Sequence, residues 1–137
     1  MTTEEKKEYL QGYRWIYRKI LSLQYKKASL IEIMESAKAI KYSDMPKVHK
    51  HTDLSDYIVK LDELITEINY KKQELEEKRL EIERCIVGLD EKEKQVIRKR
   101  YIELRKWGDI SKIMSLNIRT VHRVHGRALN KIVIVIL

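Results

Sequence analysis

The sequence of 137 residues contains only one proline and four glycines. This scarcity of turn-forming residues argues against a turn-rich all-β protein and favours long, uninterrupted helices. The single cysteine, Cys85, excludes an internal disulfide framework, and nothing resembles a cysteine-rich zinc site. No apolar run reaches the roughly 18–20 residues that span a bilayer. The first twenty residues carry charges throughout, so we expect no signal peptide and a soluble protein of a reducing compartment.

Positive charge is concentrated near the C-terminal end of the sequence. The chain has 29 Lys and Arg against 21 Asp and Glu, a net charge of +8, of which residues 89–137 carry +7. A small module with such a field favours polyanions. Nucleic acid is therefore the first candidate partner, and an anionic membrane surface is the second.

Apolar spacing predicts two long helices within residues 1–88. The first begins at Thr3, which would cap an acidic first turn, and ends near residue 39. Its apolar stripe consists of Tyr9, Tyr13, Ile16, Ile20, Leu23, Leu30, Met34 and Ala37. Residues 41–53 hold the only proline and are predicted to form a loop. The second helix is predicted over Leu54–Val87, with apolar residues seven apart from Leu54 to Leu89.

This seven-residue spacing is typical of a coiled-coil-like seam, and it leaves two interpretations open. The first helix could fold back on the second as a hairpin. The seam, together with the apolar end of the chain, could also join two chains as a homodimer. Cys85 falls on the seam and is predicted to be a small buried hydrophobe.

Residues 89–137 are predicted to form a second domain of short helices. Gly88 would end the long helix, and Asp90 with Glu93 forms a capping box for the next one. Its predicted buried face is Val96, Ile97, Tyr101 and Leu104. A short helix follows, marked by Trp107, Ile110, Ile113 and Met114, and Asn117 then caps the last helix, whose inner face is Val121, Val124, Ala128 and Ile132. Two short helices joined by a tight turn, the second basic on its outer face, indicate a helix-turn-helix. The fold is predicted to be all-α: a long N-terminal helical hairpin and then this module.

The last helix offers residues suited to reading DNA. Arg119 and Arg123 lie one helical turn apart near its N-terminal end, the end that enters a major groove, and arginine donates to guanine O6 and N7. The predicted base-reading residues are Arg119, Thr120, His122 and Arg123. The predicted phosphate contacts are Arg105, Lys106, Lys112, Asn117, Arg127 and Lys131. A merely solvated basic face is the alternative.

The C-terminal module resembles region 4 of the sigma-70 family, the domain that reads the promoter −35 element. The resemblance rests on two segments, KQVIRKRYIEL and WGDISKIMSLNIRTVHRVHGRALNKI, and on the basic-Ala-Leu signature at Arg127, Ala128 and Leu129. A charged helical segment precedes this module, and the run RYIELRKWGDISKIMSLNIRTVHRVHGRALNKI includes Trp107. In both respects the whole chain also resembles small phage-encoded late-gene activators of the RinA and ArpU type. This resemblance implies a sequence-specific DNA-binding regulator of transcription, active in the cytoplasm of a bacterial host, with double-stranded DNA and RNA polymerase as partners.

No other group of residues in the sequence indicates a metal site or a catalytic site. His122 and His125 lack a nearby set of Cys, Asp or Glu, so we expect no metal site. No catalytic triad or phosphate-binding loop is present, so we expect no enzyme activity, no cofactor and no membrane partner. The terminal residues 132–137 are predicted to pack against the first helix or a second chain, and exposure is the alternative. The rival function is a helical interaction protein that binds RNA polymerase or another phage protein and has little DNA affinity of its own.

Overall fold

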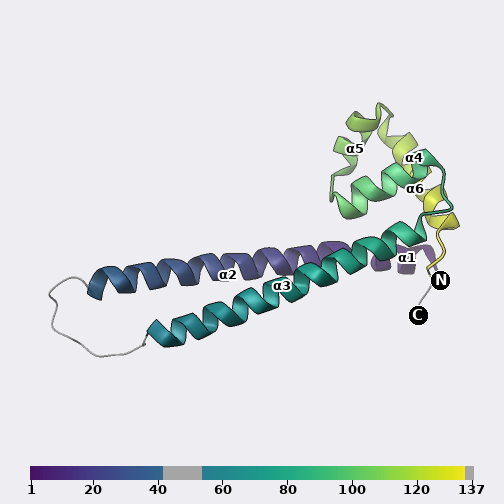
Figure 1. Ribbon diagram of the computed structural model, residues 1–137. Helices are drawn as coiled ribbons and strands as arrows, with labels where there is room; N and C mark the ends of the chain where they lie inside the picture. The colour runs from purple at the N-terminus through teal and green to yellow at the C-terminus, as the bar shows by residue number, and fades with distance from the viewer. Residues whose placement is uncertain (42–53, 135–137) are drawn as a thin grey trace. The chain divides into compact units, whose positions relative to one another are not determined.

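The computed structural model describes residues 1–41 and 54–134, and their elements are helical throughout (Figure 1). The predicted all-α fold, with a long helical hairpin before the short C-terminal helices, is thereby confirmed. Nearly all of the predicted loop at 41–53 lies outside the described residues. The elements are α1 (Thr3–Leu10), α2 (Gly12–Lys41), α3 (Leu54–Cys85), α4 (Glu91–Ile97), the π-helix η1 (Arg98–Ile102), α5 (Trp107–Met114) and α6 (Ile118–Lys131).

The first predicted helix is in fact two helices, with Gln11 between them. Its N-terminal cap is Thr2 and not Thr3, because the Thr2 hydroxyl accepts a hydrogen bond from the Glu5 amide at 3.2 Å. The acidic first turn, Glu4 and Glu5, is as predicted. The cap prediction was wrong by one residue because two adjacent threonines precede the same acidic turn, and either satisfies the sequence rule.

Packing groups the described residues into two compact units, residues 17–73 and residues 1–16 with 74–137. The domain boundary predicted at residue 88 remains a prediction. In the first unit, α2 and α3 run antiparallel as the two arms of the hairpin (Figure 1). Ile20, Leu23, Leu30 and Ile68 are buried there. The apolar spacing therefore predicted the buried face of each arm.

The second unit joins both ends of the chain around one core. Leu10 of α1 packs with Ile82 of α3, with Ile86 in the turn after it, and with Leu129 and Ile132. The helix-turn-helix therefore rests on segments from far outside its own sequence. Ile134 also packs against this core, whereas Val133 is exposed, so the described part of the apolar tail is mostly covered.

Two predicted details near the ends of helices differ from the structure. Gly88 lies in the turn after α3 but has no positive φ, so it does not act as a left-handed cap. Leu104 lies beyond the helix, with φ of 58°, and is only half-buried. In both cases the apolar spacing continues beyond the end of the helix: α3 ends at Cys85 although the seven-residue spacing runs to Leu89, and η1 ends at Ile102 although the apolar face was predicted to include Leu104.

Candidate nucleic-acid interface

The helix α4, which supports the helix-turn-helix, begins with a complete capping box. The Glu93 amide donates to Asp90 Oδ1 at 2.9 Å, and the Asp90 amide donates to Glu93 Oε1 at 3.0 Å. The hydrogen bond from the Glu93 amide holds the pKa of Asp90 below its usual value. The predicted cap is thereby confirmed, and it sets the residue at which α4 begins.

A short irregular segment turns the chain from α4 towards α5. The helix widens into a π-helical turn at η1, and Leu104 then takes the left-handed conformation. The Arg105 amide donates back to the Lys99 carbonyl at 2.9 Å. A non-glycine residue at positive φ is uncommon and persists where its surroundings hold it. The segment therefore has a defined path and delivers Trp107 to the start of α5.

The predicted helix-turn-helix is formed by α5, a tight turn and α6. Ser115 takes the left-handed conformation, with φ of 54°, and ends α5. Asn117 caps α6, because its side chain accepts from the Thr120 amide at 2.8 Å. The angle between the two helices is held by a buried cluster of Val96, Ile110, Val121 and Val124, with Trp107, Met114 and Leu116 packed against it.

The predicted base-reading residues lie on the first turns of α6. Arg119, His122 and Arg123 are exposed, and Thr120 is half-buried. Val121, which lies among them in sequence, and Val124, which follows Arg123, are buried in the core. The structure therefore brings three of the four predicted side chains to the surface at the N-terminal half of this helix. Whether these residues contact DNA stays a prediction.

An aromatic cluster braces α6 against η1 and α5. Tyr101 Oη and His125 Nε2 form a buried hydrogen bond of 2.7 Å. The Trp107 ring packs edge-on against His125 and tilted against His122, with ring centroids 4.7 Å apart in both pairs. The Arg100 guanidinium lies over the Trp107 ring, 4.6 Å from its centroid. His125 is therefore buried beneath the surface, while Trp107 packs against the exposed His122 ring.

Burial sets the protonation of this cluster. It lowers the pKa of His125 to about 4, with smaller electrostatic contributions that include those of the Lys7 and Arg100 cations. It also raises the pKa of Tyr101 to about 12. Both partners of the hydrogen bond are therefore neutral at neutral pH.

The predicted phosphate contacts fall into two groups. Lys106, at the start of α5, and Lys112 are exposed, with no ion pair to any residue in the described ranges. The other predicted phosphate contacts already make interactions within the folded chain. Arg105 Nε lies 2.7 Å from Glu103 Oε1, and the Asn117 side chain is the α6 cap.

Arg127 and Lys131 both interact with the buried carboxylate of Glu93, a pairing that the sequence did not predict. Lys131 Nζ donates to Glu93 Oε1 at 3.0 Å, and Arg127 Nε lies 4.0 Å from Glu93 Oε2. Glu93 is fully buried, and its Oε2 has no hydrogen-bond partner. The capping box identified Glu93, but its link to α6 spans 38 positions and leaves no local signal.

Two further contacts that the sequence did not reveal hold the unit together. Lys6 of α1 donates to the Leu129 carbonyl near the end of α6 at 2.9 Å, a cation at the negative end of that helix. Arg98 forms a forked pair with Glu83 of α3, with both N–O distances at 2.9 Å. These contacts tie α1 and the end of α3 to the helix-turn-helix.

The fold and the capped, basic last helix define this part of the chain as a helix-turn-helix domain. Residues 85–132, about a third of the chain, match the family model of Sigma-70, region 4. No curated protein and no solved structure matches the chain. The match agrees with the resemblance seen in the sequence, and it suggests a DNA-binding function in transcription. Among the helices of the described residues, none has an apolar stretch long enough to cross a membrane.

Proposed function

We propose that the protein is a sequence-specific DNA-binding regulator of transcription, and that it is a phage or prophage activator. The observation that carries the proposal is the exposed basic start of α6. Arg119, His122 and Arg123 protrude there, while the opposite face of the same helix is locked into the core. In a helix-turn-helix this end of the second helix enters the major groove.

The electrostatic part of the proposal assigns different roles to two groups of cations. Arg119 and Arg123 read bases, whereas Lys106, just before α5, and Lys112, on α5, contact the DNA backbone. We expect Arg119→Ala and Arg123→Ala each to cost about 1–3 kcal/mol on the cognate duplex and to reduce discrimination between sequences. Lys106→Ala and Lys112→Ala should weaken cognate and random duplexes alike and lower the salt slope by about one.

The test begins with selection of bound duplexes from a randomised pool, which yields the cognate site. Binding isotherms are then measured on that duplex and on a scrambled one at two salt concentrations. Equal losses on both duplexes for Arg123→Ala would show that α6 is not the reader. Absence of salt-dependent duplex binding by the folded wild type would favour the rival, a helical protein that binds RNA polymerase or another phage protein.

The proposal includes a homodimer that presents two reading helices. Half-sites on the DNA should then lie about 34 Å apart, or a multiple of that distance. Light scattering with and without the selected duplex measures the mass. A monomer mass at micromolar concentration in both samples would contradict this part of the proposal.

A further inference from the structure

Ile118, the first residue of α6, is an exposed apolar side chain on a basic helix. It is 49% exposed, whereas Val121 and Val124 on the same helix are buried. All of α6 lies within the described residues, and among its exposed residues Ile118 is the one with an apolar side chain. Single exposed apolar residues are common on protein surfaces. The position of Ile118 on the helix therefore decides what it can contact.

The backbone directs Ile118 beyond the N-terminal end of α6. Each Cα–Cβ bond of an α-helix tilts towards the N-terminus, so a side chain in the first turn projects ahead of the helix. The Asn117 side chain fixes this end by capping the Thr120 amide, and the Ser111 hydroxyl donates to the Leu116 carbonyl in the preceding turn. A β-branched side chain in a helix has one strongly preferred χ1 rotamer. The methyl groups of Ile118 are therefore held in one place at the leading end of the helix.

Ile118 shares this end of α6 with the residues proposed to read bases. Arg119 follows it directly, and His122 lies one turn later on the same side of the helix. The His122 ring packs against Trp107, with the ring centroids 4.7 Å apart. A duplex that presents its base edges to Arg119 and His122 therefore also meets Ile118.

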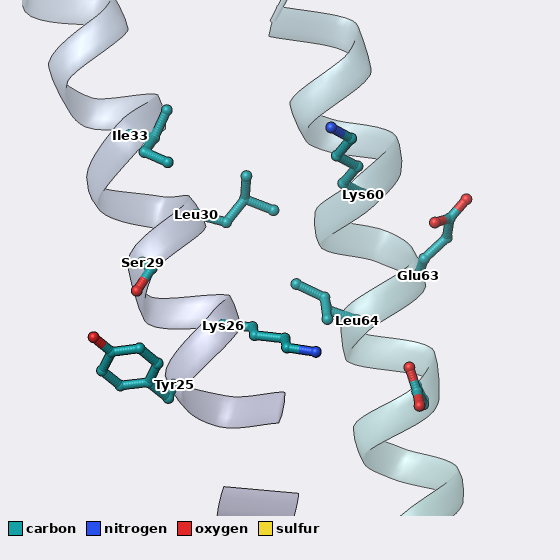
Figure 2. Close-up of a pocket in the computed structure, with 9 residues that line it drawn as sticks. Tyr25, Lys26, Ser29, Leu30, Ile33, Lys60, Glu63 and Leu64 are labelled. Carbon is teal, nitrogen blue, oxygen red and sulfur yellow. The ribbon is translucent and has the colours of Figure 1, made fainter. Parts of the chain in front are cut away.

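The charges around Ile118 identify the class of partner. The sequence of α6 contains no acidic residue, and its first two turns expose Arg119 and Arg123. By contrast, the groove between α2 and α3 carries charges of both signs beside its apolar residues, with Lys60 and Glu63 on one wall (Figure 2). Such mixed charge selects no class of partner. An apolar side chain flanked by cations matches a polyanion that also presents an apolar group.

The major groove of DNA presents one such apolar group, the C5-methyl of thymine. The other groups on the base edges there are hydrogen-bond donors and acceptors. An isoleucine side chain placed against them would remove them from water without a hydrogen bond in return, which costs free energy. Against a thymine methyl, the same side chain buries apolar surface on both partners. Thymine is therefore the base that Ile118 favours.

We propose that Ile118 is a specificity-determining residue that contacts the C5-methyl group of a thymine in the major groove, beside the bases read by Arg119 and Arg123. The inference rests on the proposed DNA binding and deepens it, because it assigns one base of the target. The reading helix thus selects a thymine by apolar contact, in addition to the bases that it recognises by hydrogen bonds.

Replacing thymine by deoxyuridine removes this methyl group and leaves base pairing unchanged. In the duplex selected from the randomised pool, each thymine is replaced in turn, and the dissociation constant of the full-length protein is measured. For the wild type, one thymine of the recognised sequence should show a loss of about fourfold, the effect expected for one buried methyl group. Ile118→Ala should bind the thymine and deoxyuridine duplexes equally at that position.

Ile113→Ala is the matched control, because Ile113 is 48% exposed but lies on α5. This variant should keep the fourfold preference for thymine. Circular dichroism should be unchanged in both variants, since each substitution shortens an exposed side chain. A loss that arises from altered DNA shape would persist in Ile118→Ala and would count against the contact.

The outcomes separate this inference from the DNA-binding proposal. If the wild type binds the selected duplex but is insensitive to every deoxyuridine, the assignment of Ile118 is wrong and the DNA binding stands. A wild type that binds no duplex would overturn both.

A repeated selection with Ile118→Ala gives a second measurement. Thymine should lose its enrichment at the assigned position, while the positions read by Arg119 and Arg123 keep theirs. Thymine enrichment that survives the substitution would contradict the proposal.

Discussion

Acidification from pH 7 to pH 5 should destabilise the helix-turn-helix through His125. This ring is buried beneath α6, hydrogen-bonded to Tyr101 and packed against Trp107. Burial, with the charges of Lys7 and Arg100 nearby, lowers its pKa from 6.5 to about 4. The folded state therefore resists a proton that the unfolded chain accepts readily.

The sign and the size follow from the two pKa values. Above pH 6.5 both states of the protein hold His125 neutral, so its contribution to stability is fully present there. As the pH falls towards 4, the unfolded chain becomes protonated first and the folded state loses stability. The full difference corresponds to about 3 kcal/mol, of which about 2 kcal/mol should be lost by pH 5.

Urea unfolding at pH 7 and pH 5 measures this loss. Carboxylates also titrate in this range, so the informative quantity is the difference between the wild type and His125→Gln, which stays neutral at both pH values. The wild type should lose about 2 kcal/mol more than His125→Gln. His122→Gln, on the exposed ring beside it, should behave as the wild type does. Equal pH dependence of the wild type and His125→Gln would refute the reasoning.

Three further substitutions test the supports of the site. Leu10→Ala should cost about 2–5 kcal/mol in thermal or urea unfolding, since Leu10 is fully buried against α6; an unchanged midpoint would show that α1 is not part of this core. Asn117→Ala should cost about 1 kcal/mol, and Asn117→Ser should restore most of it. Glu93→Gln removes the charge that holds Lys131 and Arg127, so random-duplex affinity should rise and the salt slope steepen by about one. A lower affinity or an unchanged slope would show that these two cations are not released to the backbone.

Local contacts explain why much of the fold was predictable from the sequence. Each cap, Asp90 and Asn117, accepts a hydrogen bond from the amide of a residue three positions later. Both partners are therefore visible in a short stretch of sequence. The buried faces of α2, α3 and α6 follow from periodicity, because a helix that packs on one side must repeat its apolar residues every three or four positions. The resemblance to sigma-70 region 4 rested on two short sequence segments and on the signature at Arg127, Ala128 and Leu129, and the match over residues 85–132 agrees with it.

Tertiary structure decided the features in which distant residues meet. Lys131 and Glu93 lie 38 positions apart, and Lys6 and Leu129 lie 123 apart, so no spacing rule pairs them. The same holds for Leu10, whose burial depends on where α1 packs. The sequence by itself determined where the long helices and the helix-turn-helix lie, where two of the helices are capped and which faces are apolar, since these depend on neighbours within about one turn. Only the tertiary structure decided that α1 and the end of α3 pack against the helix-turn-helix, and that Arg127 and Lys131 lie against the buried Glu93. The reason is that burial and long-range pairing arise only when distant segments pack together.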